Sequence, residues 1–188
     1  MRTEIYTMKF GINRCYIIKS GINAVMIDGG PPNALKKFKK YLKKFNLEPG
    51  EVKLIVLTHG DFDHSGSAKE IKKLTGAKVV IHENDRHLLE EGKFNWPRGA
   101  CRWGKFLRRM LIPFVKNSKL PPLNADIILS DNDYPLNEYG IPGKIIYTPG
   151  HTAGSVSVLL DSGEAFAGCL AHNNIPFRLK PNLPIFAE

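Results

Sequence analysis

Four side chains that can bind a metal ion lie close together in the segment Thr58-His59-Gly60-Asp61-Phe62-Asp63-His64. Imidazole and carboxylate groups are ligands for borderline cations such as zinc. In an extended backbone His59, Asp61 and Asp63 would project to one side, and His64 would follow where a helix begins. The alternative is a polar turn in which Asp63 or Ser65 caps that helix. The segment alone does not decide between these interpretations.

Two further loops strengthen the metal interpretation. The segment Thr148-Pro149-Gly150-His151-Thr152 follows a predicted strand and carries a histidine between turn residues. The segment Phe166-Ala167-Gly168-Cys169 places a thiol at the end of another predicted strand. Two histidine loops and a thiol at strand ends are typical of a metal site assembled from distant parts of a chain.

The elements that would position these loops alternate between strands and helices. Residues 35–45 place Leu35, Phe38, Leu42 and Phe45 on one helical face, with lysines over the remainder. The sequence predicts helices at 35–45, 65–74 and 83–91, and strands at 4–10, 15–19, 24–28, 52–57, 78–81, 127–129, 144–147, 155–160 and 165–167. This order favours βαβ units in a layered α/β domain.

Length and composition predict a single domain over residues 1–188. The net charge is +9, and the three cysteines, Cys15, Cys101 and Cys169, are too few and too scattered for a disulfide framework. We therefore expect a reducing compartment, with the cytoplasm as the location. No apolar run is long enough for a transmembrane helix.

The motifs together resemble the metallo-β-lactamase superfamily. The pattern His59-x-Asp61-x-Asp63-His64 with a later Gly-His151-Thr is similar to the signature His-x-His-x-Asp-His and Gly-His-Thr of that family. The segments Asn-Arg-Cys-Tyr-Ile-Ile and Ala-Val-Met-Ile-Asp-Gly-Gly are similar to its opening strands. The resemblance implies a four-layer αββα sandwich, here without the last C-terminal elements if the chain stops early. Metal ions would lie at one edge of two facing sheets.

Three departures from the family pattern affect the ligand set. Asp61 replaces a histidine, so the first metal would be bound by His59, Asp61 and His151. Zinc is still expected, as one or two ions, and the carboxylate makes iron or manganese more plausible. Cys169 replaces the bridging aspartate and would join Asp63 and His64 at a second ion, or else be a small buried residue. His172 does not match the position of the family's last histidine but could substitute for it.

The remaining roles follow from the same resemblance. Asp63 would orient the attacking water and act as general base, and Asp28 would orient a ligand from behind. We expect His82 to be hydrogen-bonded in that second layer, although it could line the cleft, and His87 to lie on the surface. A metal lowers the pKa of bound water, so the implied activity is hydrolysis of an ester, thioester, lactone or phosphoester. Alternatives are a metal-binding or interaction protein with weak or lost catalysis and a nucleic-acid-processing hydrolase.

Residues 92–122 interrupt the alternation of strands and helices. This insertion has no acidic residue and mixes basic with aromatic side chains, including an amphipathic stretch that ends near Pro113. The family resemblance favours a lid over a small-molecule substrate, and the charge suits an anionic one. Nucleic acid is a weaker prediction because no recognised binding motif is present. A membrane-surface contact and a homo-oligomer remain open.

Overall fold

A six-stranded sheet forms the centre of the protein. The computed structural model describes residues 3–11, 13–92, 109–110 and 120–169. The strands of this sheet are β1 (Thr3–Phe10), β2 (Asn13–Ser20), β3 (Asn23–Ile27), β4 (Val52–Val56), β5 (Lys78–His82) and β6 (Ile127–Leu129), in that spatial order. The first three pair antiparallel, whereas β4, β5 and β6 each join parallel to the strand before. The parallel strands therefore all end at the same edge.

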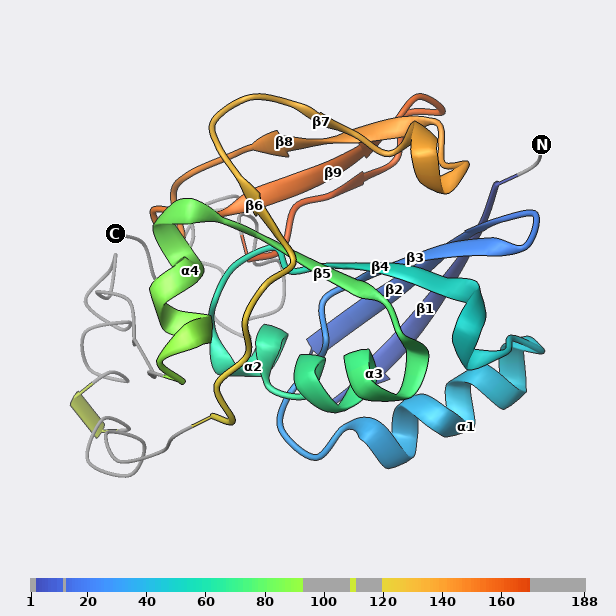
Figure 1. Ribbon diagram of the computed structural model, residues 1–188, viewed down its shortest axis with the longest axis horizontal. Helices are drawn as coiled ribbons and strands as arrows, with labels where there is room; N and C mark the ends of the chain where they lie inside the picture. Colours follow the sequence, from blue (N-terminus) through green and yellow to red (C-terminus); the bar gives the residue numbers. More distant parts are fainter. Residues whose placement is uncertain (1–2, 12, 93–108, 111–119, 170–188) are drawn as a thin grey trace.

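A four-stranded antiparallel sheet packs against the first. Its strands are β7 (Tyr134–Pro135), β8 (Gly143–Tyr147), β9 (Val156–Leu160) and β10 (Ala165–Phe166), in the order β10-β9-β8-β7. Figure 1 shows the two sheets one above the other. Apolar side chains from both, among them Ile27, Val56, Ile145 and Val158, fill the space between them. The sequence did not predict β7, which is two residues long and contains a proline.

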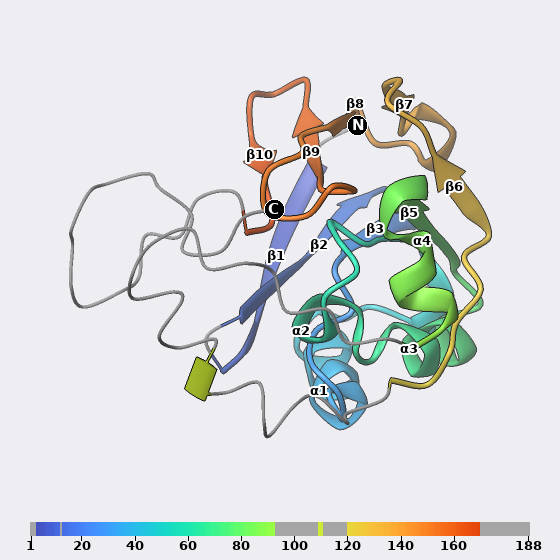
Figure 2. The ribbon, with the colours of Figure 1, turned by 90° about the vertical axis from the view of Figure 1, so that its left-hand side faces the viewer.

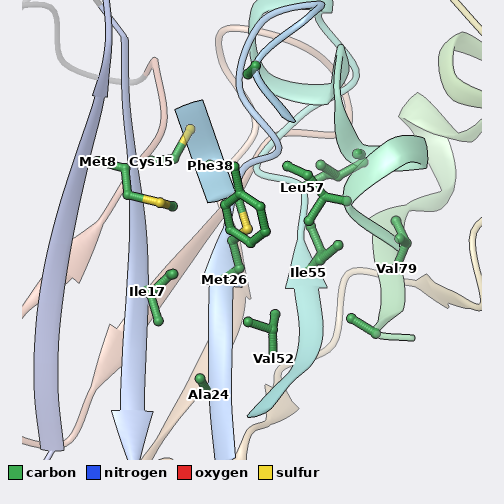
Figure 3. Packing of buried hydrophobic residues seen from close by; sticks show 14 of the residues in the cluster. Met8, Cys15, Ile17, Ala24, Met26, Phe38, Val52, Ile55, Leu57 and Val79 are labelled. Carbon is green, nitrogen blue, oxygen red and sulfur yellow. The ribbon is translucent and has the colours of Figure 1, made fainter. Parts of the chain in front are cut away.

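Helices cover the opposite face of the six-stranded sheet. Helix α1 (Leu35–Phe45) buries Phe38 and Leu42 against it, and the lysines of this helix are exposed, as predicted for a solvated surface. Helix α3 (Ala68–Thr75) packs beside it (Figure 2). Figure 3 shows Phe38 beside Met26 and Met8 in this second apolar layer. Helix α4 (Glu83–Glu90) follows β5 directly at the edge where the parallel strands end.

Two local predictions were wrong. The predicted helix 65–74 is divided into α2 (Phe62–Ser65) and α3. The division occurs because the carbonyl of His64 accepts a hydrogen bond from Gly29 N at 2.6 Å, and Ser67 turns away to bond the Pro31 carbonyl. Ser65 is consequently the last residue of α2 and not an N-cap. The strand predicted at 24–28 ends at Ile27, because Asp28 adopts a left-handed conformation with φ 62°.

The predicted mixed α/β fold with two facing sheets is confirmed in the described residues. Short 3₁₀ turns, η1 (Pro49–Glu51) and η2 (Asn137–Tyr139), complete the assigned elements. The described residues contain no helix on the outer face of the four-stranded sheet, where the fourth layer was expected. Most of the insertion, residues 93–108 and 111–119, lies outside the described residues. Within the described part, none of the helices has the length and apolar character of a membrane span.

Candidate metal centre

The predicted ligand loops meet where the two sheets join. The loop after β4 begins with Thr58, whose carbonyl accepts a hydrogen bond of 2.8 Å from the N–H of Val156 at the start of β9. The loop 148–155 connects β8 to β9 and is closed by a bond from Thr148 N to the Ser155 carbonyl at 3.0 Å. Ligands commonly bind at the carboxyl ends of parallel strands, and this is the edge at which both loops lie.

The first ligand group consists of His59, Asp61 and His151. One ligand atom from each lies within 4.8 Å of the others, and all three side chains are buried. Asp61 Oδ2 is 3.1 Å from His151 Nε2 and 3.6 Å from His59 Nε2. Burial raises the pKa of the Asp61 carboxyl, and the hydrogen bond from His151 only partly offsets this. A buried carboxylate between two imidazoles is therefore a site where a cation would be favourable.

The second group consists of His59, His64 and Cys169, so His59 belongs to both. Its ligand atoms also lie within 4.8 Å of one another, and Cys169 Sγ is 3.2 Å from His64 Nε2. Cys169 reaches this position because Gly168, with φ 52°, passes Thr58 so closely that a Cβ there would be 2.7 Å from Thr58 Oγ1. Burial raises the pKa of the Cys169 thiol, so a metal has to displace its proton.

Asp28 fixes the orientation of the His59 and His64 rings. Its carboxylate accepts hydrogen bonds from Thr58 N at 2.9 Å and from Thr58 Oγ1, and it lies 2.7 Å from His64 Nδ1. Since the Thr58 hydroxyl donates to Asp28, it accepts from His59 Nδ1 at 3.0 Å. Both rings thus carry their Nδ1 proton away from the site and present Nε2 toward it.

His64 has an altered protonation equilibrium. Burial alone would lower the pKa of this imidazole. The charge of Asp28, its hydrogen bond and the contact with Cys169 act in the opposite direction and hold the pKa well above its ordinary value. In the absence of a metal, His64 is therefore protonated over a wider pH range than an ordinary histidine.

Asp63 lies beside the two groups and in neither of them. The backbone is not extended through this segment, because α2 begins at Phe62, so the expectation of an extended backbone here was wrong. Asp63 Oδ2 is 3.8 Å from His64 Nε2 and accepts a hydrogen bond of 2.9 Å from Asn13 Nδ2. A direct role of Asp63 at a metal remains a prediction.

The other predicted histidines lie away from the two groups or outside the described residues. His82 is fully buried, bonds Asp131 Oδ1 at 3.2 Å and stacks on Tyr147 with 4.3 Å between ring centroids. It belongs to neither ligand group. The histidine is hydrogen-bonded, as expected, and its place in a layer behind the ligands stays a prediction. His87 is exposed, as expected. His172 lies outside the described residues.

Sequence reasoning missed Asp85 and the contact of Asn13 with Asp63. Asp85 is buried in the first turn of α4, and its carboxylate accepts hydrogen bonds from both ligand loops. One signal was present in the sequence: Asp85 has helical spacing with Leu88 and Leu89, which puts a carboxylate on the apolar face of that helix. Asn13 gave no comparable signal, because its partner is distant in the sequence.

The residues present fit a transition-metal ion. Asp61 Oδ1 is buried and has no hydrogen-bond partner among the described residues, so this oxygen is not satisfied by the protein that surrounds it. Across the two groups the donor types are imidazole, carboxylate and thiol, which zinc accepts in tetrahedral sites. The set is also compatible with iron or manganese at the carboxylate-containing group.

Comparison with known proteins agrees with this geometry. The model of the metallo-beta-lactamase superfamily matches residues 8–187. The chain is 31% identical over 142 residues to the probable metallo-hydrolase YflN of Bacillus subtilis, which covers 74% of this chain and 52% of that protein. It is 30% identical over 147 residues to an uncharacterised protein of Mycobacterium leprae, covering 76% and 59%. The chain thus spans between about half and three-fifths of these relatives.

A solved structure shows the same fold. The B3 metallo-beta-lactamase BLEG-1 superimposes with a TM-score of 0.69 and 21% identity, over 90% of this chain and 74% of that one. At this identity the likeness concerns the fold alone.

Proposed function

Because the chain belongs to the metallo-β-lactamase superfamily, we propose that it is a metal-dependent hydrolase of an ester, thioester, lactone or phosphoester. The observation that carries this proposal is the pair of buried ligand groups that share His59 at the edge where the two sheets meet. The name of the relative YflN, a probable metallo-hydrolase, is in agreement.

Zinc is the proposed metal. The Cys169 thiol beside His64 Nε2 is a soft donor, and a thiolate with imidazoles suits zinc better than manganese. The group with Asp61 is harder, so iron or manganese would be accepted there more readily than at the thiol. When bound, the metal supplies Lewis acidity that activates water and polarises the carbonyl or phosphoryl group.

The chain's own residues hold the ligands and move the proton. Asp28 keeps the Nε2 atoms of His59 and His64 directed into the site, through Thr58 for one and directly for the other. Asp63 takes the proton of the attacking water, because it lies beside both groups with its side chain partly exposed. Asn13 occupies Asp63 Oδ2, which leaves Oδ1 as the oxygen that accepts this proton. Asp61 partly neutralises the cation.

The expected substrate is a small molecule that enters at the joined edges of the two sheets. The basic residues of the insertion favour an anionic group on it, as the sequence predicts. We also propose a cytoplasmic location, because the two described cysteines, Cys15 and Cys169, are free thiols suited to a reducing compartment.

The experiment is reconstitution of the purified chain with zinc, iron(II) or manganese, followed by metal analysis and assays on chromogenic esters, thioesters, lactones and phosphodiesters. We expect retained zinc and hydrolysis of at least one class. His151→Ala, which removes a donor from the first group alone, should lower the retained zinc and the hydrolysis. His87→Ala, which alters an exposed histidine, should change neither.

Substitution with cobalt(II) tests the thiol. A thiolate-to-cobalt absorption band in the near ultraviolet should appear in the native chain and disappear in Cys169→Ser. A chain that retains no transition metal after reconstitution would refute the proposal. Retained metal without hydrolysis of any substrate class would support a binding protein instead.

A further inference from the structure

A buried carboxylate outside both ligand groups connects the two ligand loops. Asp85 lies in the first turn of α4 and is 2% exposed, on the same face as Leu88 and Leu89. A carboxylate in such surroundings is unfavourable unless its oxygens accept hydrogen bonds. The buried Asp85 carboxylate therefore needs hydrogen-bond donors from the protein in place of water.

The partners come from both ligand loops. Asp85 Oδ2 accepts hydrogen bonds of 2.8 Å from Gly60 N and 2.8 Å from Thr152 Oγ1, and Oδ1 accepts one of 3.0 Å from Gly154 N. Gly60 stands between His59 and Asp61, and Thr152 follows His151. One carboxylate thus contacts the immediate chain neighbours of all three residues of the first ligand group.

The packing around Asp85 shows that the fit is close. A Cβ on Gly154 would lie 2.6 Å from Asp85 Cγ, and a Cβ on Gly60 would lie 2.8 Å from Leu88 Cδ1. Real side chains essentially never approach so closely, so both loops can contact α4 only because glycine occupies these positions. Hydrogen bonding and steric fit are separate observations, and both indicate that α4 sets the distance between the loops.

We propose that Asp85 is a positioning residue that fixes the spacing between His59, Asp61 and His151 and thereby sets the metal affinity of that group. The inference rests on the proposed function in that it requires this group to bind a metal. The second group depends less on Asp85, because Asp28 holds His64 directly and His59 through Thr58, and the contact of Gly168 with Thr58 positions Cys169. A supporting partner that orients ligands commonly changes metal affinity by about tenfold to a hundredfold.

The test is cobalt(II) titration of the full chain and of Asp85→Asn. Asparagine keeps the shape but offers one oxygen and one amide N–H to three donors, so at least one bond to a ligand loop is lost. The first group contains no thiol, so cobalt bound there gives no thiolate band. We expect the affinity of this group for cobalt to fall by roughly tenfold to a hundredfold. The d–d absorption at saturating cobalt should shift, while the titration of the thiolate band stays within about twofold.

Asp126→Asn is the matched control. Asp126 also accepts a backbone hydrogen bond, from Val79 N at 2.7 Å, but at the start of β5, far along the strand from the site. It should change neither the affinity nor the d–d spectrum. If Asp85→Asn does not fold, Thr152→Val removes one donor from the same carboxylate, and it should weaken cobalt binding severalfold.

The outcomes separate the two proposals. A native chain that binds no cobalt refutes the proposed function. A native chain that binds cobalt, with Asp85→Asn or Thr152→Val indistinguishable from Asp126→Asn, leaves that function standing and refutes the role of Asp85. Equal weakening of both cobalt signals in Asp85→Asn would also refute the proposal, because it would indicate a general structural effect.

Discussion

The two ligand groups share His59 but are held by different buried carboxylates. In the group with Asp61 and His151, the supporting carboxylate is Asp85, which accepts hydrogen bonds from backbone and hydroxyl groups of the loops. In the group with His64 and Cys169, it is Asp28, which contacts His64 directly. Both groups combine donors that follow β4 of one sheet with a donor that follows a strand of the other sheet. The difference indicates that the geometry of the first group depends on the spacing of its loops, whereas that of the second depends on the orientation and charge of the His64 ring.

Removal of the shared ligand should have the largest effect. His59→Ala deletes a member of both groups, so neither retains three donors. We expect metal content to fall to background after dialysis and hydrolysis to fall roughly a thousandfold or more. Metal analysis and initial rates check this, with His87→Ala as the exposed control. If His59→Ala retained one full equivalent of metal, the two groups would not share this residue in solution.

Asp28→Asn should produce an intermediate effect concentrated on the second group. The amide cannot accept from both Thr58 and His64, so a buried donor loses its partner, at a cost of about 1–3 kcal/mol in unfolding free energy. We expect the thiolate-to-cobalt band to weaken, with a loss of affinity of about tenfold to a hundredfold.

Asp131→Asn offers a matched comparison, because Asp131 pairs with the buried ring of His82 while its own side chain is 70% exposed. Chemical denaturation and cobalt titration should show little change in that variant. Equal losses in the two variants would contradict a specific role of Asp28.

The smallest expected effect is a pH dependence of the metal-free protein. The pKa of His64 is raised above its ordinary 6.5, so its protonation stabilises the fold below that pH, and this contribution is lost as pH rises through the folded-state pKa. The pKa of Asp61 is raised above 3.8, so its protonated form also stabilises the fold, and this stabilisation begins to be lost at a lower pH than that of His64.

Thermal unfolding in a chelator should therefore show a melting temperature that decreases as the pH rises above 6.5. His64→Gln should make this decrease smaller. A metal-free protein whose melting temperature rises with pH above 6.5 would contradict this.

The sequence predicted the strands and loops well where hydrophobic periodicity and turn residues agree. The apolar run at Val52–Val56 and the lysine-covered helix at Leu35–Phe45 have the predicted form. The break between α2 and α3 could not be predicted, because it depends on a hydrogen bond from Gly29 to the His64 carbonyl across the fold. Local propensity contains no information on such a distant partner.

The candidate site was predicted in composition but not in arrangement. Motif spacing placed His59, Asp61, His151 and Cys169 together, and the structure brings all four into the two groups. It did not predict that Asp63 belongs to neither group, because the start of α2 at Phe62 was not predicted. It also missed Asp85, since an acidic residue in the first turn of a helix is usual at the surface.

The sequence distances across the site have a consequence for folding kinetics. Asp61 contacts His151 across 90 positions, and His64 contacts Cys169 across 105. Contacts of such separation form late, because the closure of long loops is entropically costly before other contacts hold them. A chain that has formed only the β3-α1-β4 unit would possess His59 and Asp61 without His151. Metal capture would thus follow docking of the two sheets, and the rate at which cobalt is bound during refolding would report that step.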